Sequence, residues 1–392
     1  MRYRRNAFTW TAFGALFAFG YLNAVLGPSL PYIRSVEGIS YVVGAFHQVA
    51  FALGGGLAGL LSARDLIPVG RRAVIAGGIA GAGLAGLAVG YGETAPITIA
   101  GAFVMGLLAT LALIRVWAAL ADAHGARRAV AMTEGEVAVS LAGVATPFLI
   151  GALAAGAATW RLAFAIGMVT AVLAAVAVLR ASVPAPRPVS AQEDEARAQP
   201  SRGRVQPTLV IVFAIVALEF ALSFWLASYL NDDVGLARDA AVAMVSGLYA
   251  SNLFGRVVAS RLARTQGAEL LLAIALGTVL IGLPFLLTAT GATGAVVGIF
   301  LTGAGIGALF PLTSSLHVQA SRRTADIALG ETLTVAALGQ TSGPLVAGVI
   351  AQVTTLRAGL LVLPALTLLA AASLSYTRVV WKTPSAPRGL AR

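Results

Sequence analysis

The chain has 392 residues, of which 58% are hydrophobic and 11% are charged. A typical soluble domain carries about 25% charged residues, so this composition excludes an ordinary soluble protein. The hydrophobic residues occur in runs of about 20, which is the length that crosses a hydrocarbon layer of roughly 30 Å. The absence of cysteine excludes disulfides and thiolate metal sites. The sequence therefore predicts an all-α, multi-pass membrane protein.

Twelve apolar segments are predicted as transmembrane helices, six on each side of a polar stretch. They span residues 8–32, 41–62, 73–91, 97–121, 130–156, 160–180, 208–230, 241–262, 269–289, 293–318, 326–353 and 357–378. The polar stretch is rich in Pro, Arg, Glu, Gln and Ser, which is typical of a flexible linker. We therefore expect an N-terminal six-helix bundle at 1–180, a cytoplasmic linker at 181–207, a C-terminal six-helix bundle at 208–380 and a cytoplasmic tail at 381–392.

The net charge of +11 is distributed unevenly over this topology. Of the 27 Lys and Arg residues, Arg115 lies within a span and four lie on the outer side, which leaves 27 − 5 = 22 on the inner side. The four outer residues are Arg34, Arg161, Arg238 and Arg357. An excess of inner positive charge sets the orientation of membrane proteins. It predicts a protein of the cytoplasmic (inner or plasma) membrane with both termini cytoplasmic, and it gives no reason to expect a nucleic-acid partner.

One motif occurs twice, about 195 residues apart. The first copy is Arg127-Arg128, Gly135-Glu136, Pro147 and Gly151, and the second is Arg322-Arg323, Gly330-Glu331, Pro344 and Gly348. In both copies the Glu lies eight residues after the second Arg, and the step from Pro to Gly is four residues. Self-similarity at half the chain length is typical of a duplicated membrane bundle rather than of a short-period solenoid.

Several motifs along the whole chain resemble those of the Major Facilitator Superfamily. The loop from Gly59 to Arg72 resembles that family's Gly…Asp-Arg…Gly-Arg-Arg loop, although Arg64 precedes Asp65 and extra residues precede Gly70. Three further segments are similar to the family pattern: a weaker copy of this loop at 255–264, Trp160-Arg161 with Phe164, and the run from Gly303 to Phe310-Pro311. The resemblance implies two six-helix bundles that move a small organic solute by alternating access. It also implies that the loop residues stabilise the inward-closed contact between the bundles; they are Asp65, Gly70, Arg71 and Arg72.

Departures from the family pattern bear on the direction of transport. Many proton-coupled drug exporters carry an Arg early in span four, where this chain has Ala102. The exporter-associated Gly-Pro motif of span five is only partial here. The segment from Glu219 to Leu230 faintly resembles the sugar–proton symporter branch that includes fucose permease. Proton-coupled uptake, proton-driven export of drugs or metabolites, and facilitative uniport are therefore all kept as alternatives.

Glu219 is the first candidate for proton coupling. It lies near the middle of the span predicted at 208–230, and no basic residue occurs in that span. Ionisable groups inside a membrane are usually functional, and a carboxylate at this depth suits a group that binds a proton from one side and releases it to the other. The alternative is a structural hydrogen bond between helices. Trp225 and Tyr229 on the same helix are candidates for stacking on a substrate or for packing.

Two base–carboxylate pairs are predicted at similar depth in the two halves. Counting inward at 1.5 Å per residue puts Arg115 and Glu136 roughly 10–12 Å inside the cytoplasmic boundary. The same count predicts that His317 and Glu331 lie at a similar depth in the second half. The pairs Arg115–Glu136 and His317–Glu331 are interpreted either as static contacts or as gating switches. His317 is the titratable member, because imidazole changes charge near physiological pH, and Arg115 has the alternative role of meeting an anionic group on the substrate.

Four further polar residues lie in spans that contribute to the central cavity of the family that the chain resembles: Tyr21, Asn23, His47 and Asn252. Each has the alternative role of an interhelical hydrogen bond.

Enzyme and channel functions are disfavoured. The chain has no His-Glu-x-x-His, nucleophilic serine or phosphate-loop motif. Asp232-Asp233 lacks the second Asp-rich cluster of a lipid transferase, and nothing resembles a selectivity filter. No metal and no cofactor are expected. The expected partners are a small-molecule substrate, protons and the lipid bilayer, and we expect a monomer.

Overall fold

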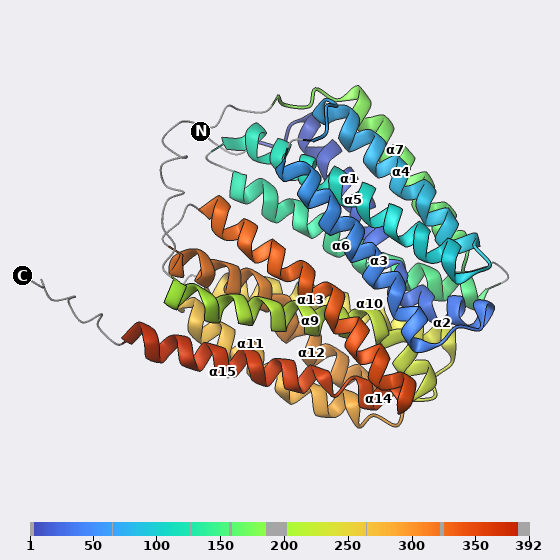
Figure 1. Ribbon diagram of the computed structural model, residues 1–392, viewed down its shortest axis with the longest axis vertical. Coiled ribbons are helices and arrows are strands. Elements are labelled where there is room, and N and C mark those ends of the chain that lie inside the picture. Colours follow the sequence, from blue (N-terminus) through green and yellow to red (C-terminus); the bar gives the residue numbers. More distant parts are fainter. Residues whose placement is uncertain are drawn as a thin grey trace, which may run out of the picture.

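A computed structural model describes residues 4–64, 66–125, 128–156, 159–185, 202–263, 265–321 and 325–382, and all regular elements in these ranges are helices (Figure 1). The helices are α1 (Ala7–Ala24), α2 (Leu26–Glu37), α3 (Tyr41–Ala63), α4 (Arg71–Tyr91), α5 (Ala95–His124), α6 (Arg128–Ala155), α7 (Leu162–Arg180), α9 (Arg202–Asp232), α10 (Arg238–Leu262), α11 (Ala268–Leu287), α12 (Ala292–Ala320), α13 (Ala325–Val353), α14 (Leu356–Gly359) and α15 (Val362–Lys382). Twelve segments of the described chain are long and apolar enough to cross a membrane. The predicted all-α, twelve-span fold class is therefore confirmed.

The first span differs most from its predicted range of 8–32. It covers 31 residues, Ala7–Glu37, and is divided into α1 and α2 at Val25. Pro28 explains the break, because it has no N–H and its ring clashes with the carbonyl four residues earlier. The seventh span also begins earlier than predicted, since α9 starts at Arg202 within the range assigned to the linker. Residues 186–201 of that linker, and the tail beyond 382, lie outside the described residues.

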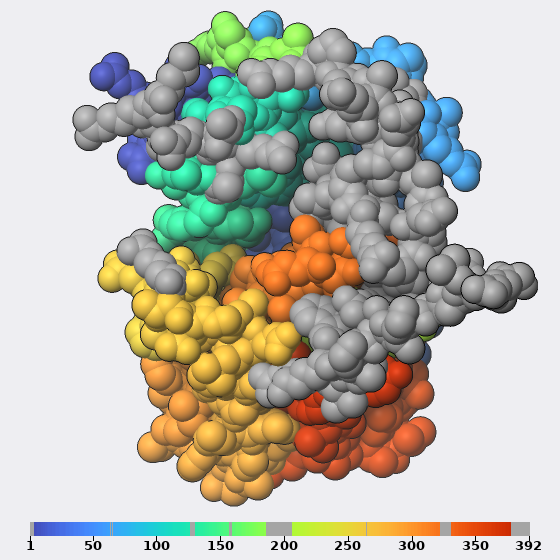
Figure 2. All heavy atoms as spheres, turned by 90° about the vertical axis from the view of Figure 1, so that its left-hand side faces the viewer, coloured from blue at the N-terminus to red at the C-terminus, as the bar shows by residue number. Residues whose placement is uncertain are grey.

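The helices form two halves that lie side by side, α1–α7 and α9–α15 (Figure 1). Both described ends of the chain, at residues 4 and 382, lie at the same end of the molecule, which we call the terminal end. The other end is called the opposite end. Figure 2 looks onto the terminal end, where α6 (teal) of the first half faces the yellow and orange helices of the second half.

The helix pairs that join the halves most extensively are α6 with α10, α3 with α13, and α2 with α9. The glycines that close the sequence repeat lie in the first two of these contacts. A Cβ on Gly151 would lie 2.7 Å from the carbonyl oxygen of Asp239, and one on Gly348 would lie 3.2 Å from Cβ of Ala45. A side chain at Gly151 would collide with backbone, and one at Gly348 would crowd Ala45, so both glycines favour a close approach of the two helices. The repeated Pro-to-Gly step therefore positions the contact between the halves toward the opposite end.

Candidate functional site

Glu219 lies at the midpoint of the seventh span, Gln206–Asp232, since 219 − 206 and 232 − 219 are both 13 residues. Its Oε1 accepts a hydrogen bond of 3.4 Å from Nδ2 of Asn252 on α10. Asn252 is 7% exposed, and its Oδ1 is shielded without a hydrogen-bond partner among the described residues. A carboxylate and a spare amide oxygen therefore meet halfway across the bundle.

Arg256 lies one helical turn from Asn252 and on the same face of α10. Its Nη1 is 3.5 Å from Oε2 of Glu136 on α6, and its Nε donates to the carbonyl of Gly307 at 3.3 Å. The Arg256 and Glu136 side chains are 34% and 48% exposed, respectively. This ion pair thus crosses between the two halves, and it remains accessible on the terminal-end side of Glu219.

The contact observed for Glu136 is with Arg256 of the other half, and the predicted pair of Arg115 with Glu136 stays a prediction. Counting residues from the membrane boundary gives the depth of a side chain in the membrane. It does not give the direction in which the side chain projects from its helix. Helix α6 packs more extensively against α10 than against α5. Arg256 was assigned to a loop motif, yet its spacing of four from Asn252 was the signal that it shares a face with a cavity candidate.

The predicted contact between His317 and Glu331 is present, with 3.3 Å between Nε2 and Oε2. His317 is fully buried, and its Nδ1 lies 2.7 Å from Oγ1 of Thr208. A neutral ring that donates from Nε2 to the carboxylate accepts the threonine hydroxyl proton at Nδ1, so one tautomer satisfies both partners. His317 therefore joins α9, α12 and α13 near the terminal end.

The first half repeats the Thr–His contact but not at Arg115. Oγ1 of Thr9 on α1 lies 2.8 Å from Nε2 of His124 on α5. The sequence repeat could have predicted this contact. Subtracting the repeat offset from His317 gives position 317 − 195 = 122, which is two residues from His124 and seven from Arg115. His124 is therefore the structural counterpart of His317 in this contact with threonine.

Four predicted cavity residues are buried and bonded within their own half. Tyr21 Oη donates to the Ala163 carbonyl at 2.7 Å, Trp225 Nε1 to the Pro344 carbonyl at 2.8 Å, and Tyr229 Oη to the Leu286 carbonyl at 2.8 Å. Nε2 of His47 lies 2.9 Å from Thr98 Oγ1. Their observed contacts are those of the packing alternative. Asn23 differs, because it is half-buried in α1 and makes no side-chain hydrogen bond to a described residue.

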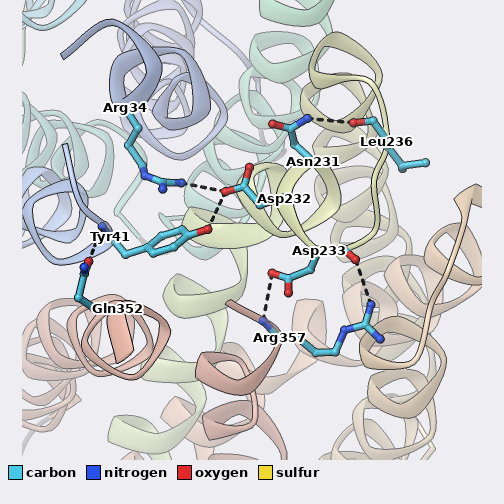
Figure 3. A network of polar contacts seen from close by, with 8 residues as sticks. All are labelled: Arg34, Tyr41, Asn231, Asp232, Asp233, Leu236, Gln352 and Arg357. Carbon is cyan, nitrogen blue, oxygen red and sulfur yellow. Dashed lines mark hydrogen bonds and ion pairs between the residues drawn. The ribbon is translucent and has the colours of Figure 1, made fainter. Parts of the chain in front are cut away.

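A polar network joins the halves at the opposite end (Figure 3). Asp232 Oδ2 accepts two bonds of 2.9 Å, one from Arg34 Nη1 and one from Tyr41 Oη. The backbone N–H of Tyr41 donates to Gln352 Oε1 at 3.0 Å. The Arg34 guanidinium also lies 3.7 Å from the centre of the Tyr41 ring. These four residues, which we call the outer network, connect α2 and α3 with α9 and α13.

The neighbouring Asp233 has a different role, because its contacts stay within the second half. Its Oδ2 accepts from the backbone N–H of Arg357 at 3.2 Å, and Arg357 Nη2 donates to the carbonyl of Asp233 (Figure 3). Arg357 Nη2 also donates to the carbonyl of Ala289. Burial raises the pKa of Asp233, while its contacts with Arg357 act in the opposite direction. From the sequence, this Asp pair was considered only as a metal-binding motif. The overlooked signal was that Arg residues predicted on the same outer side can pair with Asp232 and Asp233.

Comparison with known proteins identifies the family. A profile of the Major Facilitator Superfamily matches residues 12–330. The chain belongs to the Major Facilitator Superfamily. It is therefore a membrane transporter of the secondary type, and no curated protein matches it individually.

Several solved structures of this superfamily share the fold. A bacterial homologue of the human lysosomal transporter Spinster, inward-facing and unoccupied, has 16% identity and a TM-score of 0.73, with 98% of this chain and 100% of that chain covered. The nucleoside transporter NupG has 11% identity and a TM-score of 0.74, with 96% and 100% covered. A D-xylose–proton symporter has 18% identity and a TM-score of 0.71, with 96% and 97% covered. At these identities the likeness concerns the fold alone.

The superfamily loop motif is only partly described, because Asp65 lies outside the described residues. Gly70 is the N-cap of α4, and Arg72 is exposed. Arg71 Nη1 donates to Asp122 Oδ2 at 2.8 Å and to the Pro184 carbonyl at 3.0 Å. These contacts lie within the first half, so the role of the motif in closing the halves onto each other stays a prediction.

Proposed function

We propose that this superfamily member is a proton-coupled carrier for a small organic solute, with Glu219 as the proton-binding group. The observation that carries the proposal is the position of Glu219, which lies halfway along its span beside an ion pair that joins the two halves. A group at that point can be reached from either side as the halves rock. We further propose a monomer with the bundle boundaries expected from the sequence.

The orientation we propose has the terminal end in the cytoplasm of a cell whose cytoplasmic membrane holds the protein. The excess of Lys and Arg in the terminal-end segments supports it. In that orientation the outer network closes the external side, and the accessible Glu136–Arg256 pair faces inward. The arrangement described would then be inward-facing.

Arg256 supplies a coupling mechanism, because it lies within electrostatic range of both Glu219 and Glu136. A proton on Glu219 removes one of the two charges that attract the guanidinium, so Arg256 pairs with Glu136 and links the halves as observed. When Glu219 is ionised, it competes for Arg256, and the link to Glu136 weakens. Protonation therefore favours the described arrangement, since a ligand shifts a conformational equilibrium by its differential affinity for the two states.

His317 and Glu331 form the second candidate group for coupling or gating. The imidazole joins α9 to α13, and α13 also carries Gln352 of the outer network. A change of charge on His317 would alter both contacts, and so the position of α13 relative to α9. We assign it the role of adjusting the equilibrium that Glu219 drives.

The test uses the absence of cysteine, which makes any introduced cysteine a unique site for a spin label. One labelled pair replaces Val36 and Val353 at the opposite end, which are 50% and 80% exposed, and a second replaces Val130 and Leu262 at the terminal end, which are 41% and 43% exposed. Distances are measured by pulsed electron paramagnetic resonance in acidic and alkaline buffer. We expect the two distances to change in opposite directions between the two buffers, because one end of the molecule opens as the other closes when the halves rock.

Glu219→Gln, which mimics the protonated form, should keep the acidic distances in both buffers. Glu93→Gln is the matched control, because Glu93 is exposed in the loop between α4 and α5, and it should respond as the wild type does. A Glu219→Gln protein whose distances still change with pH would remove Glu219 as the coupling residue.

A further inference from the structure

The charges around Glu219 do not cancel. Glu219 and Glu136 contribute two negative charges, and Arg256 contributes one positive charge, so the group carries −2 + 1 = −1 when both carboxylates are ionised. The Glu136–Arg256 pair is accessible, whereas Glu219 lies between the helices, so an ionised Glu219 is stabilised by one added positive charge.

Other titratable groups on the helices that pack against Glu219 lie toward the ends of the bundle. His317 contacts Thr208, which is 11 residues or roughly 16 Å along α9 from Glu219. Apart from Tyr249 on α10, further described titratable groups on these helices are Tyr32, Arg34, Glu37, Glu134, Tyr229, Asp232, Arg238, Asp239, Arg261, Glu331, Arg357 and Tyr376. None of them is among the charges that act on Glu219, which are those of Arg256 and Glu136.

The hydrogen-bonding capacity left over at this group consists of acceptors. Oε2 of Glu219 makes no hydrogen bond to a described residue, and Oδ1 of Asn252 is shielded without a partner. Both atoms accept and neither donates when the carboxylate is ionised. A shielded acceptor such as Asn252 Oδ1 is destabilising without a donor, so a ligand that brings N–H donors completes the site.

An aromatic residue shares a helix face with one of these acceptors. Tyr249 lies three residues before Asn252 on α10, and so on the same face of that helix. Its ring reaches the other half, because a Cβ on Gly143 of α6 would lie 2.9 Å from a ring carbon. A carboxylate, an amide oxygen and an aromatic ring together suit an organic ammonium group, which combines positive charge, N–H donors and attraction to an aromatic face.

We propose that the transported solute is an organic monocation whose ammonium group binds Glu219, Asn252 and Tyr249, and that it exchanges with the proton on Glu219. This inference rests on the proposed role of Glu219. The exchange is balanced: the protonated carboxyl group and the ammonium ion give a carboxylate–ammonium pair and one free proton. With either ligand the group is neutral, with both it would be +1, and an anionic solute would bring it to −2.

Three probes of similar size and different charge test the proposal: phenethylamine, 2-phenylethanol and phenylacetate. Binding to the purified full-length protein is followed by thermal shift and by proton release into weakly buffered solution. We expect only phenethylamine to bind, with release of about one proton per bound amine in acid, where the carboxyl group is protonated. Its apparent Kd should rise about tenfold for each unit of pH below the protonation midpoint.

Variants locate the binding group. Glu219→Gln should lose both phenethylamine binding and proton release, whereas Glu93→Gln should retain both. Tyr249→Leu should weaken phenethylamine binding about threefold, and Tyr249→Phe should retain it because the ring remains.

The proposal is overturned if 2-phenylethanol or phenylacetate binds as tightly as phenethylamine, if none of the three binds, or if the amine binds without releasing a proton. Failure of the inference can be told from failure of the proposed function. If the label distances depend on pH through Glu219 but amine binding does not depend on Glu219, the coupling role of Glu219 is retained. The proposal that the solute is a monocation is then rejected. Distances that ignore Glu219 would remove both.

Discussion

The two halves of the molecule share a packing contact and differ at the point where a charge lies. Thr9 with His124 and Thr208 with His317 join the first and fourth spans of their respective halves. The offset between the two threonines, 208 − 9 = 199, puts Gly20 in the first half where the second has Glu219. A Cβ on Gly20 would lie 2.8 Å from the carbonyl oxygen of Val139, so this position makes a tight helix contact. The halves therefore keep the same packing, and the mid-membrane carboxylate belongs to the second half alone.

The largest expected effect is the difference between substitutions at Glu219 and at Gly20, its counterpart in the first half. Glu219→Gln should abolish the dependence of the label distances on pH, because the only change is the loss of a titratable group. Gly20→Ala should keep that dependence but lower the free energy of unfolding by about 2 kcal/mol, since the added methyl group meets backbone of α6. Both are checked by label distances and thermal unfolding. A loss of pH response in Gly20→Ala would contradict the division of roles between the halves.

The next effect concerns the outer network. Asp232→Asn removes the charge that Arg34 pairs with, and the arrangement open at the opposite end should gain about 1 kcal/mol, or roughly fivefold in population. Asp233→Asn is the matched control, because Asp233 bonds only within the second half, and its distances should match the wild type. The Val36–Val353 label pair measures both. Equal shifts in the two variants would show that the Asp232 contact does not hold the halves together.

A smaller effect distinguishes the two histidines. His124→Gln and His317→Gln each perturb a bond to threonine and should lower the free energy of unfolding by about 1 kcal/mol. Only His317 also contacts Glu331, so only His317→Gln should displace the pH at which the label distances change. A pH displacement of the same size in His124→Gln would show that the Thr–His contact, and not Glu331, is responsible.

The smallest effect is expected at two buried tyrosines that pack alike in the two halves. Tyr21→Phe and Tyr229→Phe each remove one hydrogen bond to a backbone carbonyl and should cost about 1 kcal/mol without changing the pH response. Chemical denaturation and the label distances provide the check. A changed pH response in Tyr229→Phe would show that Tyr229 has a role in the central cavity and not in packing alone.

The spans were predicted well because bilayer thickness fixes the length of an apolar run, whatever the helices pack against. The depth of His317 and Glu331 was likewise a matter of counting along two neighbouring helices. The interruption at Val25 was missed even though Pro28 signals it, because an apolar run continues through the break.

Contacts between the halves were not predictable in the same way. Glu136 pairs with Arg256, which lies 120 residues away, and Arg34 pairs with Asp232, which lies 198 residues away. Depth in the membrane does not say in which direction a side chain leaves its helix. That direction depends on how the two halves dock, and the docking rests on close approaches such as those at Gly151 and Gly348.

The most direct test of the central claim is an infrared difference spectrum between acidic and alkaline buffer. If Glu219 is the proton-binding group, the wild-type protein will show a band of a protonated carboxyl group in acid, and the band will be absent from Glu219→Gln. Glu136→Gln should retain that band, since Glu136 keeps Arg256 as its partner when Glu219 is protonated. A band that persists in Glu219→Gln and disappears in Glu136→Gln would contradict the account.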